Sequence, residues 1–100
     1  MLSEDPATVT KFVEGLREEL ARVCEKCVDF AFANIACRCG NTLLTTTLSM
    51  EVGRGLHVGI PRSISVVIAL RGGVEKVVEL AELVRDVAKR CGIAVRIRLR

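Results

Sequence analysis

The hydrophobic positions near the start of the chain repeat with the period of an α-helix. Apolar side chains recur at three- and four-residue spacings over residues 9–23, and charged side chains occupy the opposite side of the same turns. Pro6 suits the first turn of a helix, and Ser3 or Asp5 can cap its N-terminus. The pattern predicts a helix over residues 6–25.

The next two segments alternate between apolar and polar side chains, which is typical of half-buried strands. Residues 28–38 predict a first strand, although a helical spacing that continues through Asn34 fits the same stretch. Gly40 and Asn41 predict a tight turn. The unbroken alternation over residues 42–52 then predicts a second strand.

The second half of the chain predicts two more strands around a second helix. A glycine-rich basic connection over residues 53–62 leads to the nearly continuous apolar run of residues 63–71, which suits a strand covered on both faces or a subunit contact. Two glycines end this strand, and the helical period returns over residues 74–90. Residues 93–100 alternate as the last strand.

These elements predict a single α+β domain over residues 1–100, in the order αβββαβ. The expected architecture is a two-layer sandwich, with two helices on one face of a four-stranded mixed sheet. Because the first, third and fourth strands should run the same way, both helices should end at one edge of the sheet. Cys24, Cys27 and Cys91 should gather at that edge, where the loop over residues 53–62 also arrives. The opposite edge should hold both helix N-termini and five side chains: Cys37, Cys39, Arg38, Arg71 and Arg100.

The amino-acid composition indicates the environment in which we expect the protein to work. A chain of 100 residues that is 50% hydrophobic is too apolar for disorder, and no apolar run approaches the roughly 20 residues of a membrane span. The acidic N-terminus lacks the apolar stretch of a signal peptide, so we expect a cytoplasmic protein with no membrane partner. Gln, Trp and Tyr are missing, and Arg outnumbers Lys by 11 to 4. This balance is typical of hyperthermophile proteins, although a GC-rich mesophile can also produce it.

Five cysteines strengthen the thermophilic interpretation, because hyperthermophilic archaea carry disulfides inside the cell whereas mesophiles keep cytosolic thiols reduced. In composition and in its cysteines the chain resembles small cysteine-bearing proteins of hyperthermophilic archaea. The resemblance implies thermostability and tolerance of disulfides, and it implies no particular activity. The cysteines that carry it are Cys24, Cys27, Cys37, Cys39 and Cys91.

The spacing of the cysteines admits a redox pair, a zinc site or structural disulfides. A redox pair needs a thiolate at a helix N-terminus, but Cys24 and Cys27 follow a predicted helix C-terminus, which disfavours the thiolate. Tetrahedral zinc takes four ligands, and Cys24-x-x-Cys27 with Cys37-x-Cys39 supplies four thiolates. The nine residues between the two pairs would span about 30 Å when extended, which separates the pairs too far. A mixed zinc site at the shared edge stays possible and would use Cys24, Cys27, Cys91 and His57.

Structural disulfides are the favoured interpretation, with an odd cysteine left free or paired between subunits. Cys37 and Cys39 should not bridge each other, because their Cα atoms would lie about 6.5–7 Å apart on one strand face. We predict that Cys91 bridges Cys27 or Cys24, since both helices should end at the same edge. The alternative is that several cysteines are small buried side chains with no bond.

Charge is uneven along the chain, with a net charge of −3 over residues 1–36 and +6 over residues 37–100. Arg96, Arg98 and Arg100 form a row on the last strand, and Arg38 and Arg71 are further candidates for binding an anion. Such a row can neutralise phosphates. Aromatic side chains that stack on bases are absent from the predicted surface strands, and arginine on an edge strand also prevents pairing with other chains.

The sequence carries no recognisable catalytic set or cofactor motif. His57 is the single histidine, and Ser63, Ser65 or Asp29 can be drawn into a triad only arbitrarily. The glycine pair of residues 53–55 does not open a helix, so the dinucleotide and phosphate-loop patterns both fail. We therefore lean against an enzyme and expect no cofactor.

The leading functional expectation is a disulfide-stabilised, non-enzymatic domain that forms a homodimer through its sheet. Val67 and Ala69 place apolar side chains on the outward side of the third predicted strand, which suggests a two-fold contact. An RNA- or DNA-binding module that uses the Arg row is the first alternative. A structural zinc-binding protein is the second.

Overall fold

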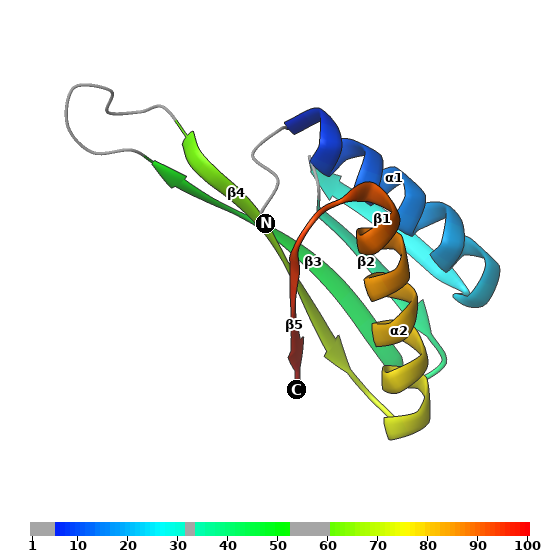
Figure 1. The fold of residues 1–100 in the computed structure, drawn as a ribbon. Helices are drawn as coiled ribbons and strands as arrows, with labels where there is room; N and C mark the ends of the chain where they lie inside the picture. Colours follow the sequence, from blue (N-terminus) through cyan, green and yellow to red (C-terminus); the bar gives the residue numbers. More distant parts are fainter. Residues whose placement is uncertain (1–5, 32–33, 53–60) are drawn as a thin grey trace.

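The computed structural model describes residues 6–31, 34–52 and 61–100 and has two helices and five strands (Figure 1). The elements follow one another along the chain in the order αββββαβ. Their bounds are α1 (Pro6–Val23), β1 (Lys26–Ala31), β2 (Asn34–Cys39), β3 (Thr42–Val52), β4 (Pro61–Arg71), α2 (Val74–Cys91) and β5 (Val95–Leu99).

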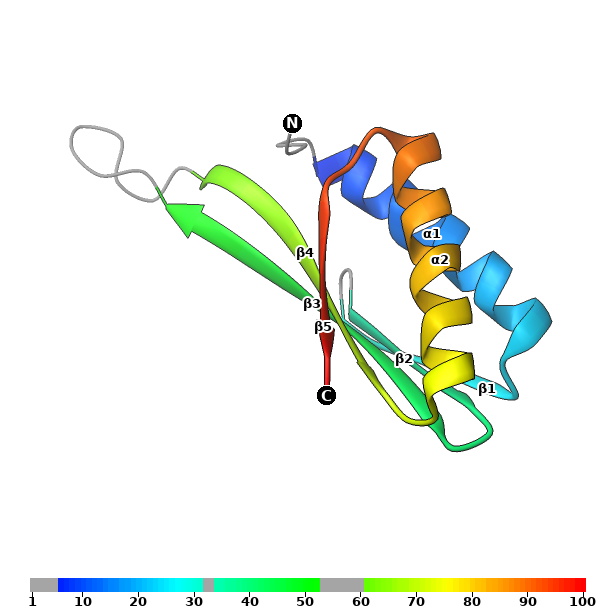
Figure 2. The ribbon, with the colours of Figure 1, turned by 60° about the horizontal axis from the view of Figure 1, so that its bottom comes forward.

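The five strands form one mixed sheet in the order β1-β2-β3-β4-β5, and β1 and β5 are its edges. The pairs β1–β2, β2–β3 and β3–β4 are antiparallel, whereas β5 runs parallel to β4 and is reached through α2. Both helices cover the same face of the sheet, α1 over β1 and β2, and α2 over β3, β4 and β5 (Figure 2). This arrangement confirms the predicted α+β class and its two layers.

The predicted strand over residues 28–38 is wrong in one respect, because this segment is a hairpin. Ala31 pairs with Asn34 and Lys26 pairs with Arg38, so the chain reverses in the middle of the segment and forms β1 and β2. An alternation of apolar and polar side chains looks the same along one long strand and along two short antiparallel ones. The sheet therefore has five strands rather than four.

The extra reversal also changes the direction of α1 relative to α2. A Cβ placed on Gly15 in α1 would lie 3.5 Å from Val87 near the end of α2, whereas Cys24 at the end of α1 interacts with Lys76 at the start of α2. The two helices are therefore antiparallel. The expectation that they run the same way, and that their C-termini share an edge, is wrong.

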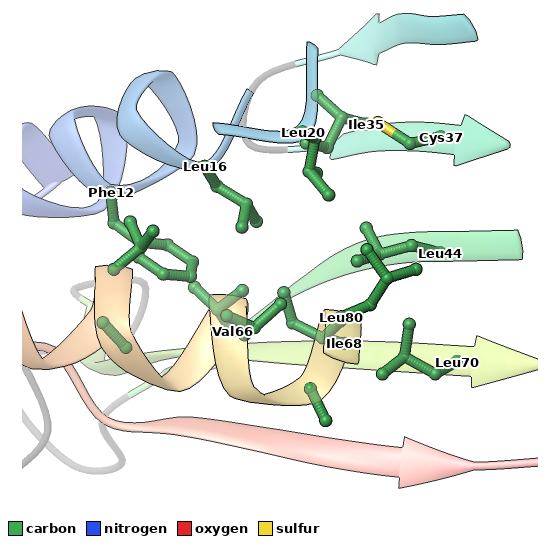
Figure 3. Packing of buried hydrophobic residues seen from close by; sticks show 14 of the residues in the cluster. Phe12, Leu16, Leu20, Ile35, Cys37, Leu44, Val66, Ile68, Leu70 and Leu80 are labelled. Atoms are coloured by element: carbon green, nitrogen blue, oxygen red, sulfur yellow. The ribbon is translucent and has the colours of Figure 1, made fainter. Parts of the chain in front are cut away.

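The core lies between the helices and the sheet (Figure 3). Fully buried apolar side chains stabilise a fold by roughly 1.5–3 kcal/mol each relative to leaving them exposed. The largest of them come from α1 (Val9, Phe12, Leu16, Leu20), from α2 (Leu80, Val84, Val87) and from the strands (Ile35, Leu44, Val66, Ile68, Leu70).

One buried hydroxyl completes the sheet where its backbone ladder stops. The pairing of β2 with β3 ends at Ala36 and Thr45. One step further along β3, the Thr46 hydroxyl accepts a hydrogen bond from the Ile35 backbone N–H at 2.7 Å. The Thr46 hydroxyl therefore satisfies a buried donor that would otherwise cost about 1–3 kcal/mol.

Candidate functional site

Several elements converge at one end of the strands, where four of the five cysteines lie. The end of α1, the start of β1 and the end of β2 meet there, beside the start of α2. We call this end of the sheet the cysteine end, and it contains Cys24, Cys27, Cys37 and Cys39. The sequence placed Cys24 and Cys27 at the opposite edge from Cys37 and Cys39, and the β1–β2 hairpin overturns that placement.

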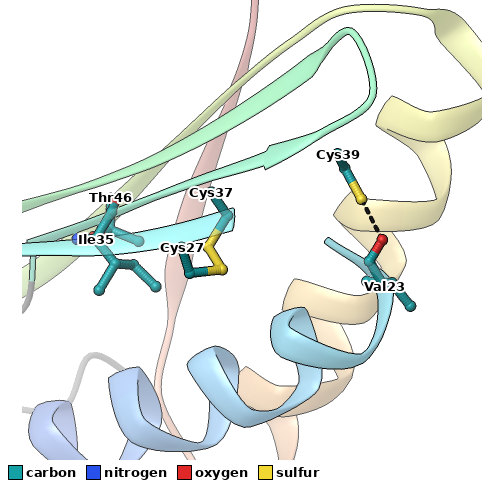
Figure 4. Close-up of a disulfide and its surroundings, with 6 residues drawn as sticks. All are labelled: Val23, Cys27, Ile35, Cys37, Cys39 and Thr46. Atoms are coloured by element: carbon teal, nitrogen blue, oxygen red, sulfur yellow. Dashed lines mark hydrogen bonds between the residues drawn. A yellow bond between two sulfur atoms is a disulfide. The ribbon is translucent and has the colours of Figure 1, made fainter. Parts of the chain in front are cut away.

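Cys27 and Cys37 form a disulfide across this hairpin (Figure 4). They are directly opposed in the register of β1 and β2, and their Cα atoms lie 4.1 Å apart. The predicted bridge from Cys91 to Cys27 or Cys24 is therefore wrong, and Cys91 is a free thiol. Cys91 ends α2, and the 15 residues that separate it from Lys76 correspond to about 22 Å of helix.

Cys39 holds the end of α1 against β2. Its side chain is buried, and its thiol donates a hydrogen bond to the Val23 carbonyl, with 2.6 Å between sulfur and oxygen (Figure 4). The last carbonyls of a helix have no partner within the helix, so this thiol satisfies one of them.

Cys24 lies against Cys39 and stays protonated at neutral pH. Burial, a hydrogen bond with Cys39 and the charge that Cys39 can carry together raise the pKa of Cys24 to about 12. The nearby Lys76 lowers this pKa but does not offset the increase. Since the thiolate is the nucleophile and the metal ligand, Cys24 is poorly prepared for either function in this state.

The structure also changes the argument about zinc. The nine residues between Cys27 and Cys37 fold back as a hairpin, so the objection that they span about 30 Å does not hold. Two of the four sulfurs at the cysteine end are bonded to each other, and the described part of the chain has no group of three or more His, Cys, Asp or Glu side chains placed to hold a metal. Of the alternative mixed set, Cys91 is distant and His57 lies outside the described residues.

Besides the cysteine end, the molecule has a second candidate site on the open face of the sheet, which is the face that the helices do not cover. Val66, Ile68 and Leu70 of β4 point into the core. Val67, Ala69 and Arg71, which alternate with them, therefore face the other way. The register pairs β5 residues 96 and 98 with β4 residues 67 and 69. Arg96 and Arg98 therefore lie on the open face, as the alternation along the last strand predicted.

Basic side chains also form a row across the sheet at the cysteine end, at every strand except β3, where the exposed Leu43 takes the position. Lys26 pairs with Arg38, Arg38 with Leu43, and Leu43 with Arg71. The Arg100 N–H donates to the Leu70 carbonyl at 2.9 Å, which places Arg100 beside Arg71. Together with the residues on β5, this row makes an L-shaped surface that we call the basic face: Lys26, Arg38, Arg71, Arg96, Arg98 and Arg100.

The six side chains of the basic face are all exposed, and none has an ion-pair partner among the residues that the structure describes. Strands lie about 4.8 Å apart and rise about 3.3 Å per residue, so the row across the sheet spans about 19 Å and the row along β5 about 13 Å. A hollow of about 330 Å³ beside it is lined by Arg38, Gly40, Asn41 and Leu43.

The helical layer, by contrast, carries no excess charge. Acidic and basic residues are equal in number on α1 and α2, and several of them pair, as Lys76 does with Glu79 at 3.2 Å. The acidic residues of the helices are Glu14, Glu18, Glu19, Glu75, Glu79, Glu82 and Asp86, and the basic ones are Lys11, Arg17, Arg22, Lys76, Arg85, Lys89 and Arg90. Positive charge is therefore concentrated on the sheet.

Sequence reasoning identified five residues of the basic face and missed Lys26. Lys26 was missed because the hairpin was not predicted, and the hairpin makes Lys26 a cross-strand neighbour of Arg38. The candidates for catalysis cannot be placed, because His57 lies outside the described residues and the side chains of Asp29, Ser63 and Ser65 are not described.

Comparisons with protein-family models, with curated proteins and with solved structures find no significant match to this chain. Neither of the two described helices is long and apolar enough to cross a membrane.

Proposed function

We propose that the basic face binds the phosphate backbone of a nucleic acid. The observation that carries the proposal is the set of six exposed cations on one open sheet face, none of them with an ion-pair partner in the described part of the chain. Because these side chains form no ion pair with any described residue, a phosphate can bind them without breaking one of the ion pairs of the described structure. Release of the counterions around the nucleic acid then favours binding.

The side chains of the face favour contacts with the backbone over readout of bases. Between the cations lie the exposed Leu43, Thr45 and Thr47 and the half-buried Val67 and Ala69, and none of these can stack on a base. Arginine, threonine and backbone N–H groups are common partners of phosphate oxygens, and such contacts carry no sequence information. We therefore infer binding with little sequence preference and with a strong dependence on salt.

The same charges bear on self-association through the sheet. The apolar pair Val67 and Ala69 lies between a threonine column on β3 and the arginines on β5. A two-fold contact over this pair would bring two basic faces together, and like charges repel when they are brought close. The charge of the open face therefore favours a polyanion over a second copy of this chain as its partner.

Fluorescence anisotropy with a labelled duplex of about 20 base pairs and the matching single strand tests the proposal. A complex of six phosphate contacts should give a log–log salt slope of about −5 on the duplex and lose about 10³-fold in affinity between 50 and 200 mM salt. The triple variant Arg96→Ala, Arg98→Ala, Arg100→Ala should reduce the size of the slope by about 3.

The matched control removes three exposed cations from the helical layer, in the variant Lys11→Ala, Arg85→Ala, Lys89→Ala. This variant has the same net charge as the first one, and we expect its salt slope to stay close to that of the natural chain. Failure of the natural chain to bind either probe at about 50 mM salt would overturn the proposal, since binding of this kind is strongest at low salt. An equal loss of slope in both variants would also overturn it.

A further inference from the structure

Two free thiols are held together at the cysteine end by the backbone around them. The N–H of Cys24 donates to the Leu20 carbonyl at 2.7 Å and ends α1, and the N–H of the next residue donates to the Arg38 carbonyl at 3.0 Å. The Cys39 thiol donates to the carbonyl of the residue before Cys24. The last two of these hydrogen bonds fix residues 23–25 alongside residues 38–39, and the side chains of Cys24 and Cys39 are hydrogen-bonded to each other.

The two thiols differ in how they can be reached from solvent. Cys24 is half-buried and lines a hollow of about 440 Å³ together with Arg17, Ala21 and Cys27. Cys39 is only 2% exposed. Cys39 lines a separate hollow of about 550 Å³ beside the start of α2, but its side chain is almost fully covered, so a small reagent reaches Cys24 more easily.

We propose that Cys24 and Cys39 are a site of oxidative modification, at which a small-molecule disulfide introduces a second disulfide into the folded chain. This inference is independent of the proposed nucleic-acid function. The Cys24 sulfur attacks one sulfur of the reagent and loses its proton to solvent, and the reagent's other half leaves as a thiolate. The Cys39 sulfur then attacks the Cys24 sulfur of the mixed disulfide and displaces the second half of the reagent. Two S–H bonds and one reagent S–S bond are broken, and one protein S–S bond and two reagent thiols are formed.

The surroundings of Cys24 give this reaction a characteristic dependence on pH. The thiolate is the attacking species, and burial together with Cys39 raises the pKa of Cys24 to about 12. Below that pH the thiolate fraction grows about tenfold for each pH unit, and so should the rate. The pair should therefore close slowly at pH 7 and about a hundredfold faster at pH 9.

The new bridge would enclose the existing one. Cys24 and Cys39 lie outside Cys27 and Cys37 in the sequence, so the second disulfide would join the end of α1 to the end of β2 around the hairpin. It restricts the unfolded chain further and should raise the Tm by several degrees for a domain of this size.

Trypsin makes the test direct, because it places Cys24, the Cys27–Cys37 pair and Cys39 in three different peptides. Cleavage after Arg22, Lys26, Arg38 and Arg54 leaves Cys24 in residues 23–26, Cys27 with Cys37 in residues 27–38, and Cys39 in residues 39–54. The experiment starts from a Cys91→Ser variant, so that Cys24 and Cys39 are the free thiols. The protein is incubated with oxidised glutathione at pH 7 and pH 9, alkylated, digested without reductant and analysed by mass spectrometry.

We expect a protein that is lighter by two hydrogens, a cross-linked peptide that joins residues 23–26 to residues 39–54, and much faster formation at pH 9. A glutathione adduct that persists on Cys24 would overturn the proposal. Peptide 23–26 linked to peptide 27–38 would overturn it as well, since it shows exchange with the Cys27–Cys37 disulfide instead. Full alkylation of both thiols after oxidation of the folded protein would do the same.

Two further variants in the Cys91→Ser background test the separate roles of the two thiols. Cys39→Ser removes the second attacking thiol, so Cys24 should stop at the glutathione adduct and the Tm should not rise. Cys24→Ser leaves only the buried Cys39, which should not react, and it serves as the control if the substitution at Cys39 prevents folding. A cross-link or a rise in Tm in either variant would contradict the assignment.

Discussion

At the scale of single residues, the turn between β4 and α2 depends on a position where no side chain fits. Gly72 has a φ of +146°, which side chains of L-residues rarely adopt, and a Cβ built on it would lie 2.6 Å from the Thr42 Cα. The other close atoms are the Thr42 Oγ1 and Cβ, and because the Cα is backbone, Thr42 cannot move aside without shifting β3. The adjacent Gly73 has a φ of −64° and open space around it. The chain thus has two adjacent glycines of which only one is required by geometry.

We predict that Gly72→Ala lowers the free energy of unfolding by on the order of 2 kcal/mol or more, because the strained backbone and the contact with Thr42 add together. Gly73→Ala is the matched control, and its effect should stay within about 1 kcal/mol. Urea denaturation followed by circular dichroism measures both. Equal stability of the two variants would show that the close approach to Thr42 is not maintained.

At the scale of elements, the β1–β2 hairpin is the part of the fold that depends most on a covalent bond. It forms one edge of the sheet, so β1 pairs with β2 alone, whereas β2 pairs with both β1 and β3. The Cys27–Cys37 disulfide crosses this pairing in the middle of β2, with a sequence separation of 10. The bridge therefore restricts the part of the unfolded chain that becomes the edge hairpin.

Reduction of this disulfide should lower the free energy of unfolding by about 2–3 kcal/mol, according to the loop-entropy model for a loop of about 10 residues. The measurement compares urea midpoints with and without a thiol reductant. A Cys27→Ala, Cys37→Ala variant should be less stable by a similar amount and should not respond to reductant, whereas Cys91→Ser should respond as the natural chain does. No difference between the oxidised and reduced protein would show that the bridge does not form in solution.

At the scale of the whole molecule, charge is divided between the two layers. The helical layer is balanced, and the open face of the sheet carries the six cations of the basic face. Homodimer formation through the sheet stays a prediction, and this division determines how it should respond to salt. Screening shortens the range of repulsion between the two basic faces, from about 30 Å at 0.01 M to about 3 Å at 1 M ionic strength.

We therefore expect a 10.9 kDa species at low salt and a dimer fraction that grows as salt is added. Sedimentation velocity at micromolar concentration over a salt series measures this. The triple variant at Arg96, Arg98 and Arg100 should dimerise at lower salt than the natural chain. A dimer that is stable at low salt and unaffected by the variant would place the contact on another surface.

The sequence by itself determined the elements whose period is unambiguous. The helical spacing predicted α1 and α2 to within two residues at each end, strict alternation predicted β3 and β5, and a nearly continuous apolar run predicted most of β4. The same alternation assigned Arg96 and Arg98 to the side away from the core, because the side chains of a strand alternate between two faces wherever that strand lies.

Only the tertiary structure decided where the chain reverses and which residues meet as a result. A period of two is unchanged when a strand folds back on itself, so residues 28–38 carried no clear signal of the hairpin apart from Asn34, a residue that tolerates turns. That reversal brings Cys27 opposite Cys37, Lys26 beside Arg38, and the end of α1 to Cys39. Pairing between strands depends on contacts across space, and the order of polar and apolar residues along the chain does not specify them.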